Sequence, residues 1–261
     1  MCRPTYPHVA HHRATDNQGR VWTLKRILLL TLCILTVTAG ITNVAATSLF
    51  SGTSRLAAFM SPLEATMPTW HMERYVSMLE NAGYKVDVLL NGNVSLAFLE
   101  TGLAKYDVII LRTDYFTGEG FNYFCAGDPA TRQTRSTYAG EIAKQEAAVE
   151  ECTGFSMLFI MNHYPAGSLH GFFYVISGAS AELASVLLKA GADAFIGYYE
   201  DIYGLAWGRM DALAIQVLKY MSAGASIRDA FIQLYRYLMT GHGVTATLPP
   251  IYWYGDGDYK L

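Results

Sequence analysis

Polar side chains follow two apolar stretches that have the pattern of buried strands. The first stretch ends in Arg112, Thr113 and Asp114, and the second is closely followed by Ser177 and Ser180. Working groups in a doubly wound α/β sheet lie at the carboxyl ends of its strands, so these residues are the first candidates for chemistry. A serine hydroxyl becomes a nucleophile when a nearby base takes its proton. An aspartate, with an ordinary pKa of about 4, is a poor base at neutral pH, so an Asp/Ser pair alone does not predict hydrolysis.

A histidine could rebuild such a site with one of the two serines as the nucleophile. His163 and His170 lie on the connection that precedes the second stretch, and either imidazole would have to reach a serine hydroxyl to act as the base. A histidine in a loop that also contains Gly and Pro is more often a solvated turn residue, and we favour that interpretation. His71 and His242 lie on or beside expected helices and are interpreted as surface groups.

Two acids, Glu200 and Asp201, follow an expected strand at the same edge of the sheet. Carboxylates in this position could select a basic ligand, but a solvated loop explains them better and is the favoured interpretation. Arg112 and Thr113 are also candidates for the edge of a cleft, where they would hold the shape of the adjoining loop. No Cys/His spacing in the sequence indicates a metal site, and no cofactor is expected.

The N-terminal part of the chain has the composition of a membrane anchor or an export signal. Residues 1–26 contain five bases and one acid, a net charge of +4, so the remainder carries −7. No charged residue occurs between Ile27 and Ser54, and Ile27 to Ala46 is mostly apolar. About 20 apolar residues suffice to cross a bilayer, and basic residues on the amino side predict an exported remainder. The alternatives are a cleaved signal peptide, since 44–46 is Val-Ala-Ala, and a buried helix.

These features divide the chain into a basic tail at 1–26, a transmembrane anchor or signal segment at 27–50, and an α/β domain at 55–261. The acidic balance of the domain argues against a nucleic-acid surface, which needs a basic stripe. Expected partners are the membrane, through Ile27 to Ala46 if that segment is uncleaved, and a peptide or protein ligand. We expect the domain to lie outside the cytoplasm, either at the cell membrane or secreted.

The four cysteines follow the same division. Cys2 and Cys33 lie in the N-terminal part, whereas Cys125 and Cys152 lie in the part expected to be exported. Only the last two could pair there, and a disulfide is favoured in an oxidising compartment. Two unrelated free thiols remain an equal alternative.

Strands and helices alternate along residues 55–261, which predicts a mostly parallel sheet with helices on both faces. The expected strands are 55–60, 85–90, 107–111, 155–161, 172–176 and 194–198, and the expected helices are 70–81, 95–103, 141–151, 181–190, 208–222 and 226–239. Residues 115–140 are polar and rich in glycine, which predicts a long functional or lid-like loop. The expected fold class is a three-layer α/β/α sandwich with a doubly wound sheet, preceded by one N-terminal hydrophobic helix.

Two segments resemble the caspase-like cysteine peptidases, nearest to the clostripain and gingipain branch. They are Lys105-Tyr-Asp-Val-Ile-Ile-Leu-Arg-Thr113 and Leu183-Ala-Ser-Val-Leu-Leu-Lys-Ala-Gly-Ala-Asp-Ala-Phe-Ile-Gly197. The closing Tyr254-Gly-Asp-Gly-Asp-Tyr-Lys-Leu261 is similar to the Gly-Asp-Pro ending of gingipain-type domains, with Gly257 where proline is usual. The likeness covers most of residues 105–261. It implies a caspase-like sheet with a peptidase dyad at the ends of two neighbouring strands.

In that family one strand ends in the catalytic histidine and the next core strand ends in Gly-Cys, whose thiolate attacks the scissile carbonyl. Asp114 and Gly178 occupy the matching positions here, so neither reacting group is retained. We therefore expect a catalytically inactive domain that acts as a binding or structural module. One alternative is an active peptidase or hydrolase with a rebuilt serine site. Another is an amidotransferase-like or small-molecule-binding α/β domain, although the Gly-x-Cys-x-Gly, Gly-x-Gly-x-x-Gly and P-loop motifs are missing.

Overall fold

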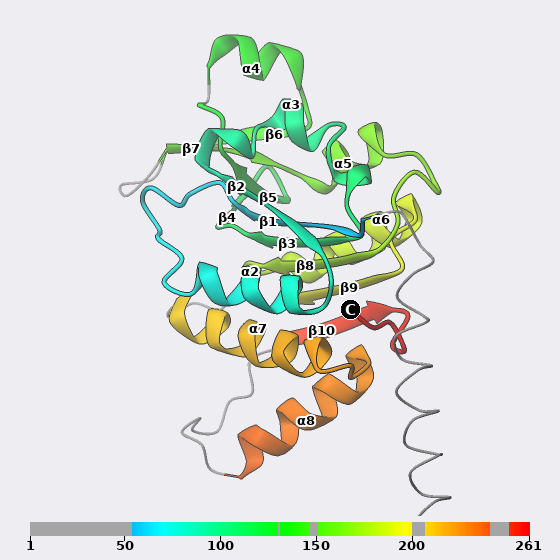
Figure 1. Ribbon diagram of the computed structural model, residues 1–261. Coiled ribbons are helices and arrows are strands. Elements are labelled where there is room, and N and C mark those ends of the chain that lie inside the picture. The colour runs from blue at the N-terminus through cyan, green and yellow to red at the C-terminus, as the bar shows by residue number, and fades with distance from the viewer. Residues whose placement is uncertain (1–53, 130, 147–150, 200–206, 241–250) are drawn as a thin grey trace, which may run out of the picture. The chain divides into compact units, whose positions relative to one another are not determined.

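Six strands form a central sheet, sheet A, in the part of the chain that the structure describes (Figure 1). This computed structural model describes residues 54–129, 131–146, 151–199, 207–240 and 251–261, all within one unit of the chain, Ser54–Leu261. The strands of sheet A are β1 (Leu56–Ser61), β2 (Lys85–Leu90), β3 (Val108–Arg112), β8 (Phe172–Ile176), β9 (Ala194–Tyr198) and β10 (Ile251–Gly255). Their order across the sheet is β10-β9-β8-β3-β1-β2.

Five of these strands pair in parallel, and β10 runs antiparallel to β9 at one edge. Every residue of β3, β8 and β9 is buried, as expected for parallel strands that are covered on both faces. Along β3, Val108 and Ile110 pack into one apolar cluster, and Ile109 and Leu111 pack into the other. The predicted α/β fold with a mostly parallel sheet is confirmed.

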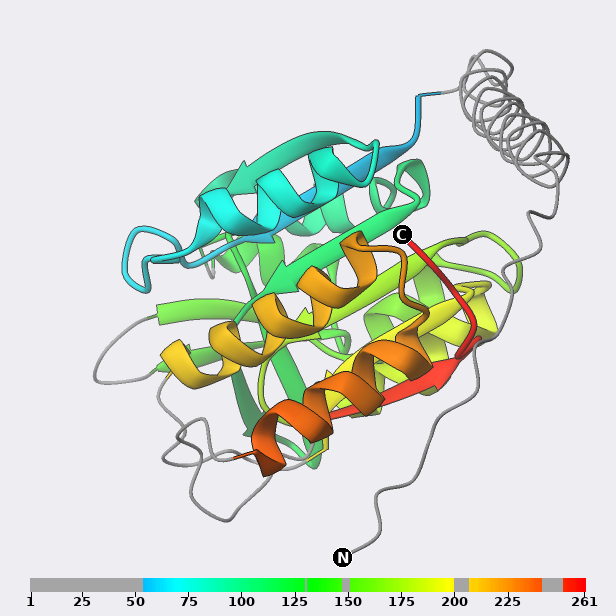
Figure 2. The same ribbon diagram turned by 60° about the horizontal axis from the view of Figure 1, so that its bottom comes forward.

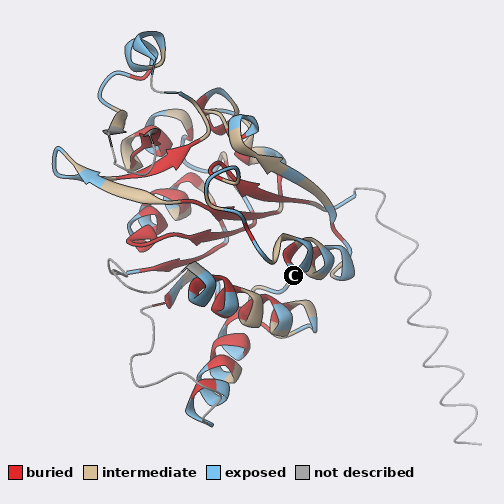
Figure 3. Ribbon diagram, turned by 90° about the vertical axis from the view of Figure 1, so that its left-hand side faces the viewer, coloured by how far each residue is buried: buried red, intermediate tan, exposed pale blue. Residues whose placement is uncertain are grey.

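Helices cover both faces of sheet A. Figures 1 and 2 show α2 (Met72–Asn81), α7 (Trp207–Ser222) and α8 (Ile227–Met239) on one face. The other face carries α3 (Leu96–Leu99), α5 (Met157–His163) and α6 (Leu183–Ala190). The helices bury their apolar residues against the sheet and expose their opposite sides (Figure 3), which is the arrangement of a three-layer sandwich.

A second sheet, sheet B, packs with the helices on the α5 and α6 side. Its antiparallel strands are β4 (Tyr115–Gly118), β5 (Phe121–Ala126), β6 (Ile142–Glu146) and β7 (Glu151–Phe155), in the order β4-β5-β7-β6. The prediction of a lid-like loop over 115–140 is therefore wrong, since these residues form β4, β5 and the helix α4 (Arg132–Thr137). Glu119 and Gly120 join β4 to β5 with φ values of 50° and 83°, as a two-residue hairpin turn requires.

Two further predictions are wrong in the segment between β5 and β8. The expected helix at 141–151 is wrong, since residues 142–146 form β6 and Glu151 begins β7, while 147–150 lie outside the described residues. Pairing within sheet B overrides the helix propensity of the Ala and Lys residues of β6. The expected strand at 155–161 is mostly helix α5. Ser156 begins this helix, since its side chain accepts a hydrogen bond from the Leu158 backbone N–H. A short apolar run cannot by itself distinguish a strand from a buried helix.

The remaining predicted elements of the domain are present, with small shifts at their ends. The expected helix at 95–103 is divided into α3, which Ser95 caps, and a short 3-10 helix, Leu103–Lys105. Within the described residues no helix is long and apolar enough to span a membrane. The expected hydrophobic segment, Ile27 to Ala46, lies outside the described residues.

Candidate functional site

The carboxyl ends of β1, β3 and β8 lie side by side. Met60 of β1 is level with Leu111 of β3, and Arg112 is level with Ile176 of β8. The chain leaves β1 toward the outer strand β2 and then returns across β1 to β3. This reversal is a topological switch point, where open α/β sheets bind their ligands.

Asp114 and Gly178, which we expected to correspond to the dyad of caspase-like peptidases, follow these neighbouring strand ends. The Thr113 backbone N–H donates a hydrogen bond to the Ile176 carbonyl over 3.2 Å, which extends the pairing of β3 and β8. The Asp114 carboxylate accepts a hydrogen bond from the Tyr115 backbone N–H over 2.9 Å, at the start of β4. The Thr113 hydroxyl donates to the Cys125 carbonyl over 2.7 Å. Thr113 and Asp114 therefore anchor sheet B to the end of β3.

The Tyr115 ring occupies the space in front of Gly178. A Cβ atom on Gly178 would lie 2.3 Å from Cε1 of this ring and 3.1 Å from two further ring atoms. Such distances are far below van der Waals contact, so no side chain fits at this position unless Tyr115 moves. A nucleophile attached to this Cα would meet an aromatic ring instead of a substrate.

The two serines beside Gly178 are both fully buried. The Ser180 hydroxyl lies 2.9 Å from the Val175 carbonyl and 2.8 Å from the Ser177 carbonyl, and it accepts a hydrogen bond from the Tyr198 backbone N–H over 3.0 Å. It therefore ties the end of β8 to β9. The Ser177 Oγ has no hydrogen-bond partner among the described residues.

The histidines that were considered as bases lie elsewhere. His163, on α5, contacts two acids, with Nε2 3.0 Å from Glu141 Oε2 and Nδ1 3.5 Å from Glu100 Oε1. His170 Nε2 lies 3.5 Å from Asp107 Oδ1. Asp107 precedes β3 and His170 precedes β8, so both lie at the amino ends of these strands, opposite the candidate site. Neither histidine is hydrogen-bonded to Ser177 or Ser180. Among the described residues, no histidine is paired with a serine in a rebuilt site.

The remaining candidate residues are the two acids after β9 and the two cysteines of the domain. Glu200 and Asp201 lie outside the described residues. Cys125 and Cys152 are joined by a disulfide that links β5 to β7, and both are buried beside Leu63. The described residues contain no group of three or more potential metal ligands.

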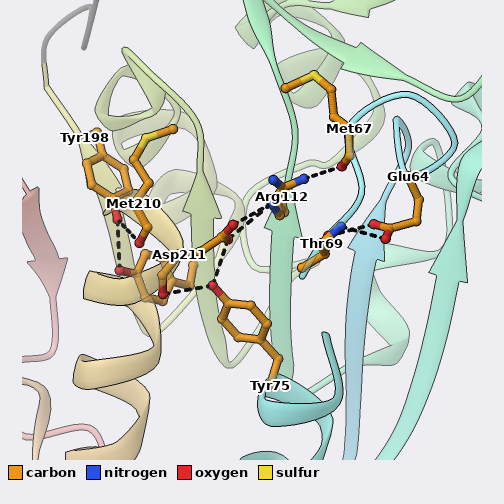
Figure 4. Close-up of polar contacts among 9 residues, drawn as sticks. Glu64, Met67, Thr69, Tyr75, Arg112, Tyr198, Met210 and Asp211 are labelled. Atoms are coloured by element: carbon orange, nitrogen blue, oxygen red, sulfur yellow. Dashed lines mark hydrogen bonds and ion pairs between the residues drawn. The ribbon is translucent and has the colours of Figure 1, made fainter. Parts of the chain in front are cut away.

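A buried polar network at this edge centres on Asp211, near the start of α7. The Arg112 Nε lies 3.1 Å from Asp211 Oδ1 and 3.2 Å from Oδ2, and the Tyr75 hydroxyl donates to Oδ1 over 3.0 Å (Figure 4). Arg112 and Asp211 side chains are each only 3% exposed. Burial, together with the Asp211 carboxylate, raises the pKa of Tyr75 well above its ordinary value, so the hydroxyl stays a neutral donor.

The network joins three elements that are distant in sequence. Tyr75 comes from α2, Arg112 from the end of β3 and Asp211 from α7. The sequence contains a signal for this role. Asp211 precedes the buried Ala214, Leu218 and Met221 by three, seven and ten residues, so it lies on the apolar side of its helix. A carboxylate on that side needs a buried partner.

A pocket of about 520 Å³ opens above this ion pair. We call it the switch-point pocket; its lining residues are Thr66, Met67, Pro68, Trp70, His71, Arg112, Gly208 and Asp211. The loop between β1 and α2 supplies most of its wall, and the end of β3 and the start of α7 supply the rest. The sequence predicted Arg112 at a cleft edge, but the loop residues and Asp211 were missed.

No protein-family model matches this chain, and no curated protein matches it.

Proposed function

We propose that residues 55–261 form a caspase-like domain that does not hydrolyse peptides and that acts outside the cytoplasm as a binding module. The family part of this proposal depends on the sequence motifs at 105–113, 183–197 and 254–261. The five parallel strands β1, β2, β3, β8 and β9 are the first to fifth along the chain, and their order across the sheet is 2-1-3-4-5. This doubly wound order agrees with a caspase-like domain. Many unrelated domains share that order, so it supports the fold class more strongly than the family.

One observation carries the proposed lack of hydrolysis, namely the contact between the Tyr115 ring and Gly178. The ring fills the place where a catalytic thiol would project, and Asp114 stands after β3 where the family has its histidine. Ser180 cannot replace the thiol, since its hydroxyl is buried and hydrogen-bonded within the turn. Ser177 is equally buried. An active serine hydrolase, the second candidate, would need one of these hydroxyls exposed beside a base.

Covalent labelling tests this proposal. We expect neither a fluorophosphonate nor a thiol-directed peptide ketone to label the oxidised wild-type domain, and we expect no cleavage of a mixed pool of acidic and basic peptides. The matched controls are Ser177→Ala and Ser180→Ala. Labelling that is lost in either control would overturn the proposal.

A grafting experiment asks whether the Tyr115 ring itself blocks the site. Asp114→His combined with Gly178→Cys restores both family residues but keeps the ring. The same pair combined with Tyr115→Gly removes the ring as well. We expect a thiol-directed reagent to label position 178 in the second variant at least about tenfold faster than in the first, with circular dichroism confirming that both fold. Equal labelling would show that the ring is no barrier.

Export is proposed from the N-terminal sequence, and the disulfide supports it. The Cys125–Cys152 pair is buried in sheet B, and structural disulfides are typical of oxidising compartments. Sequencing the mature N-terminus in the membrane and soluble fractions distinguishes an anchor, which retains residues 1–50, from a cleaved signal. A full-length chain recovered from the cytoplasm with free Cys125 and Cys152 thiols would contradict export.

A further inference from the structure

We propose that the switch-point pocket binds a neutral apolar group, preferably an aromatic ring. This inference depends on the proposed binding function and names the class of ligand for it. The group could be the side chain of a peptide or part of a free small molecule, since both would present the same chemistry.

The position of the pocket is the first argument. It lies where the chain crosses from β1 to β3, bounded by the loop after β1 and by Arg112 at the end of β3. Clefts at the switch point of a doubly wound sheet are its usual ligand sites. The volume of about 520 Å³ falls within the range of about 300–1,000 Å³ that is typical of small-molecule pockets.

The walls are the second argument. Met67, Pro68 and Trp70 give the pocket a mostly apolar lining. Trp70 is 87% exposed, although tryptophan is one of the residues that gain most from burial. Exposed tryptophans of this kind are enriched among the residues that dominate binding energy at interfaces. A bound ring would cover the Trp70 side chain and the adjacent wall.

The floor explains why the ligand should be neutral. Both charged groups that line the pocket, Arg112 and Asp211, are paired with each other and almost fully buried. The Asp211 carboxylate also accepts the Tyr75 hydroxyl, and the Arg112 guanidinium donates to the Met67 carbonyl over 2.8 Å. A charged ligand would lose its hydration on binding, and the floor offers no net opposite charge to compensate. Such a loss of hydration is costly. His71 also lines the pocket and supplies a polar group that can orient a neutral ligand.

The wall is also held in place before any ligand arrives. Glu64 accepts hydrogen bonds from both the Thr69 backbone N–H and its hydroxyl, over 2.7 and 2.6 Å (Figure 4). Met67 packs beside the Cys125–Cys152 disulfide, and its carbonyl is bound by Arg112. A preformed pocket loses less conformational entropy on binding, so an apolar group gains more affinity from it.

The test uses two fluorescent probes that share an aromatic nucleus. N-Phenyl-1-naphthylamine is neutral, and 8-anilino-1-naphthalenesulfonate adds one negative charge. We expect saturable one-to-one binding of the neutral probe to the oxidised domain, with the sulfonate no tighter. Trp70→Ala should weaken binding about tenfold or more, as the loss of a dominant contact does. The matched control is Trp253→Ala on β10, which should leave the affinity within about twofold.

Competition distinguishes the two sources of the ligand. Capped peptides that differ at one position, with Trp or Leu against Asp or Lys, are added to the complex with the neutral probe. Displacement by the Trp and Leu peptides alone identifies a peptide side chain, and displacement only by free aromatic compounds identifies a small molecule; both outcomes support the pocket. The inference is overturned by non-saturable binding, by tighter binding of the sulfonate, or by unchanged affinity in Trp70→Ala. Serine labelling, by contrast, would refute the lack of hydrolysis without affecting this result.

Discussion

Arg112 and Asp211 form a buried ion pair that joins the end of β3 to α7, with Nε 3.1 Å from Oδ1. Removal of one partner leaves the other charge buried without compensation, which typically costs about 3–5 kcal/mol. We therefore expect Asp211→Ala to lower the free energy of unfolding by several kcal/mol in a urea titration. The matched control is Lys105→Ala, which breaks the exposed Lys105–Asp87 pair and should cost no more than about 1 kcal/mol. Equal small losses in the two variants would show that the buried pair is not an important support.

The contact of Tyr115 with Gly178 predicts a rescue between two substitutions. Gly178→Ala places a Cβ in the Tyr115 ring and should lower the free energy of unfolding by about 1–3 kcal/mol, as overpacking does. In a Tyr115→Ala background the same change should cost less than about 1 kcal/mol, because the obstructing ring is gone. Gly208→Ala is the control, since a Cβ there meets nothing within 4 Å and lies in α7, where alanine is favoured. A Gly178→Ala cost that is the same in both backgrounds would refute the contact.

The disulfide between Cys125 and Cys152 predicts that stability depends on the redox state. It closes a loop with a sequence separation of 27 residues, for which stabilisation of about 2–4 kcal/mol is typical. We expect dithiothreitol to lower the midpoint of urea unfolding in the wild-type domain. The double variant Cys125→Ala, Cys152→Ala should begin at the lower midpoint and should not respond to the reductant. A response in the double variant would mean that the reductant acts elsewhere.

The core of sheet A could be predicted from the sequence because its strands are unbroken apolar runs. β3 and β8 are buried on both faces, and helices α6, α7 and α8 follow them with clear helical spacing. Sheet B could not be predicted in the same way. Its strands include Ala, Glu and Lys residues that favour helices, and pairing between β6 and β7 decides their structure.

The candidate site shows the same difference between local and distant information. Asp114 and Gly178 lie at neighbouring strand ends because β3 and β8 pair in parallel, and the alternation of strands and helices predicted a parallel sheet. The Tyr115 ring over Gly178 is a tertiary contact between residues 63 positions apart, and no local pattern encodes it. Asp211 is the intermediate case. Its place on the apolar side of α7 indicates a buried role, but not that Arg112 is the partner.

Tyr164 predicts a loss of stability at high pH. Its hydroxyl donates to the Leu99 carbonyl over 2.7 Å and accepts from the Leu103 N–H over 3.1 Å, and burial raises its pKa to about 12. In the unfolded chain a tyrosine has a pKa of about 10, so the unfolded state loses this proton first. The contribution of the protonated Tyr164 hydroxyl to stability is therefore complete below about pH 10 and is lost as pH rises toward 12. The free energy of unfolding falls by up to about 1.4 kcal/mol per pH unit in this range.

Tyr164→Phe removes the titrating group and tests this sign directly. We expect the variant to be less stable at neutral pH, because two buried hydrogen bonds are lost, but to show a shallower decline in the free energy of unfolding between pH 10 and 12. Urea titrations at half-unit steps of pH measure both effects. The matched control is Tyr235→Phe on α8, which removes the hydroxyl of a tyrosine that is 37% exposed and should leave the wild-type slope unchanged. A Tyr164→Phe slope as steep as that of the wild type would show that this hydroxyl does not contribute to the decline.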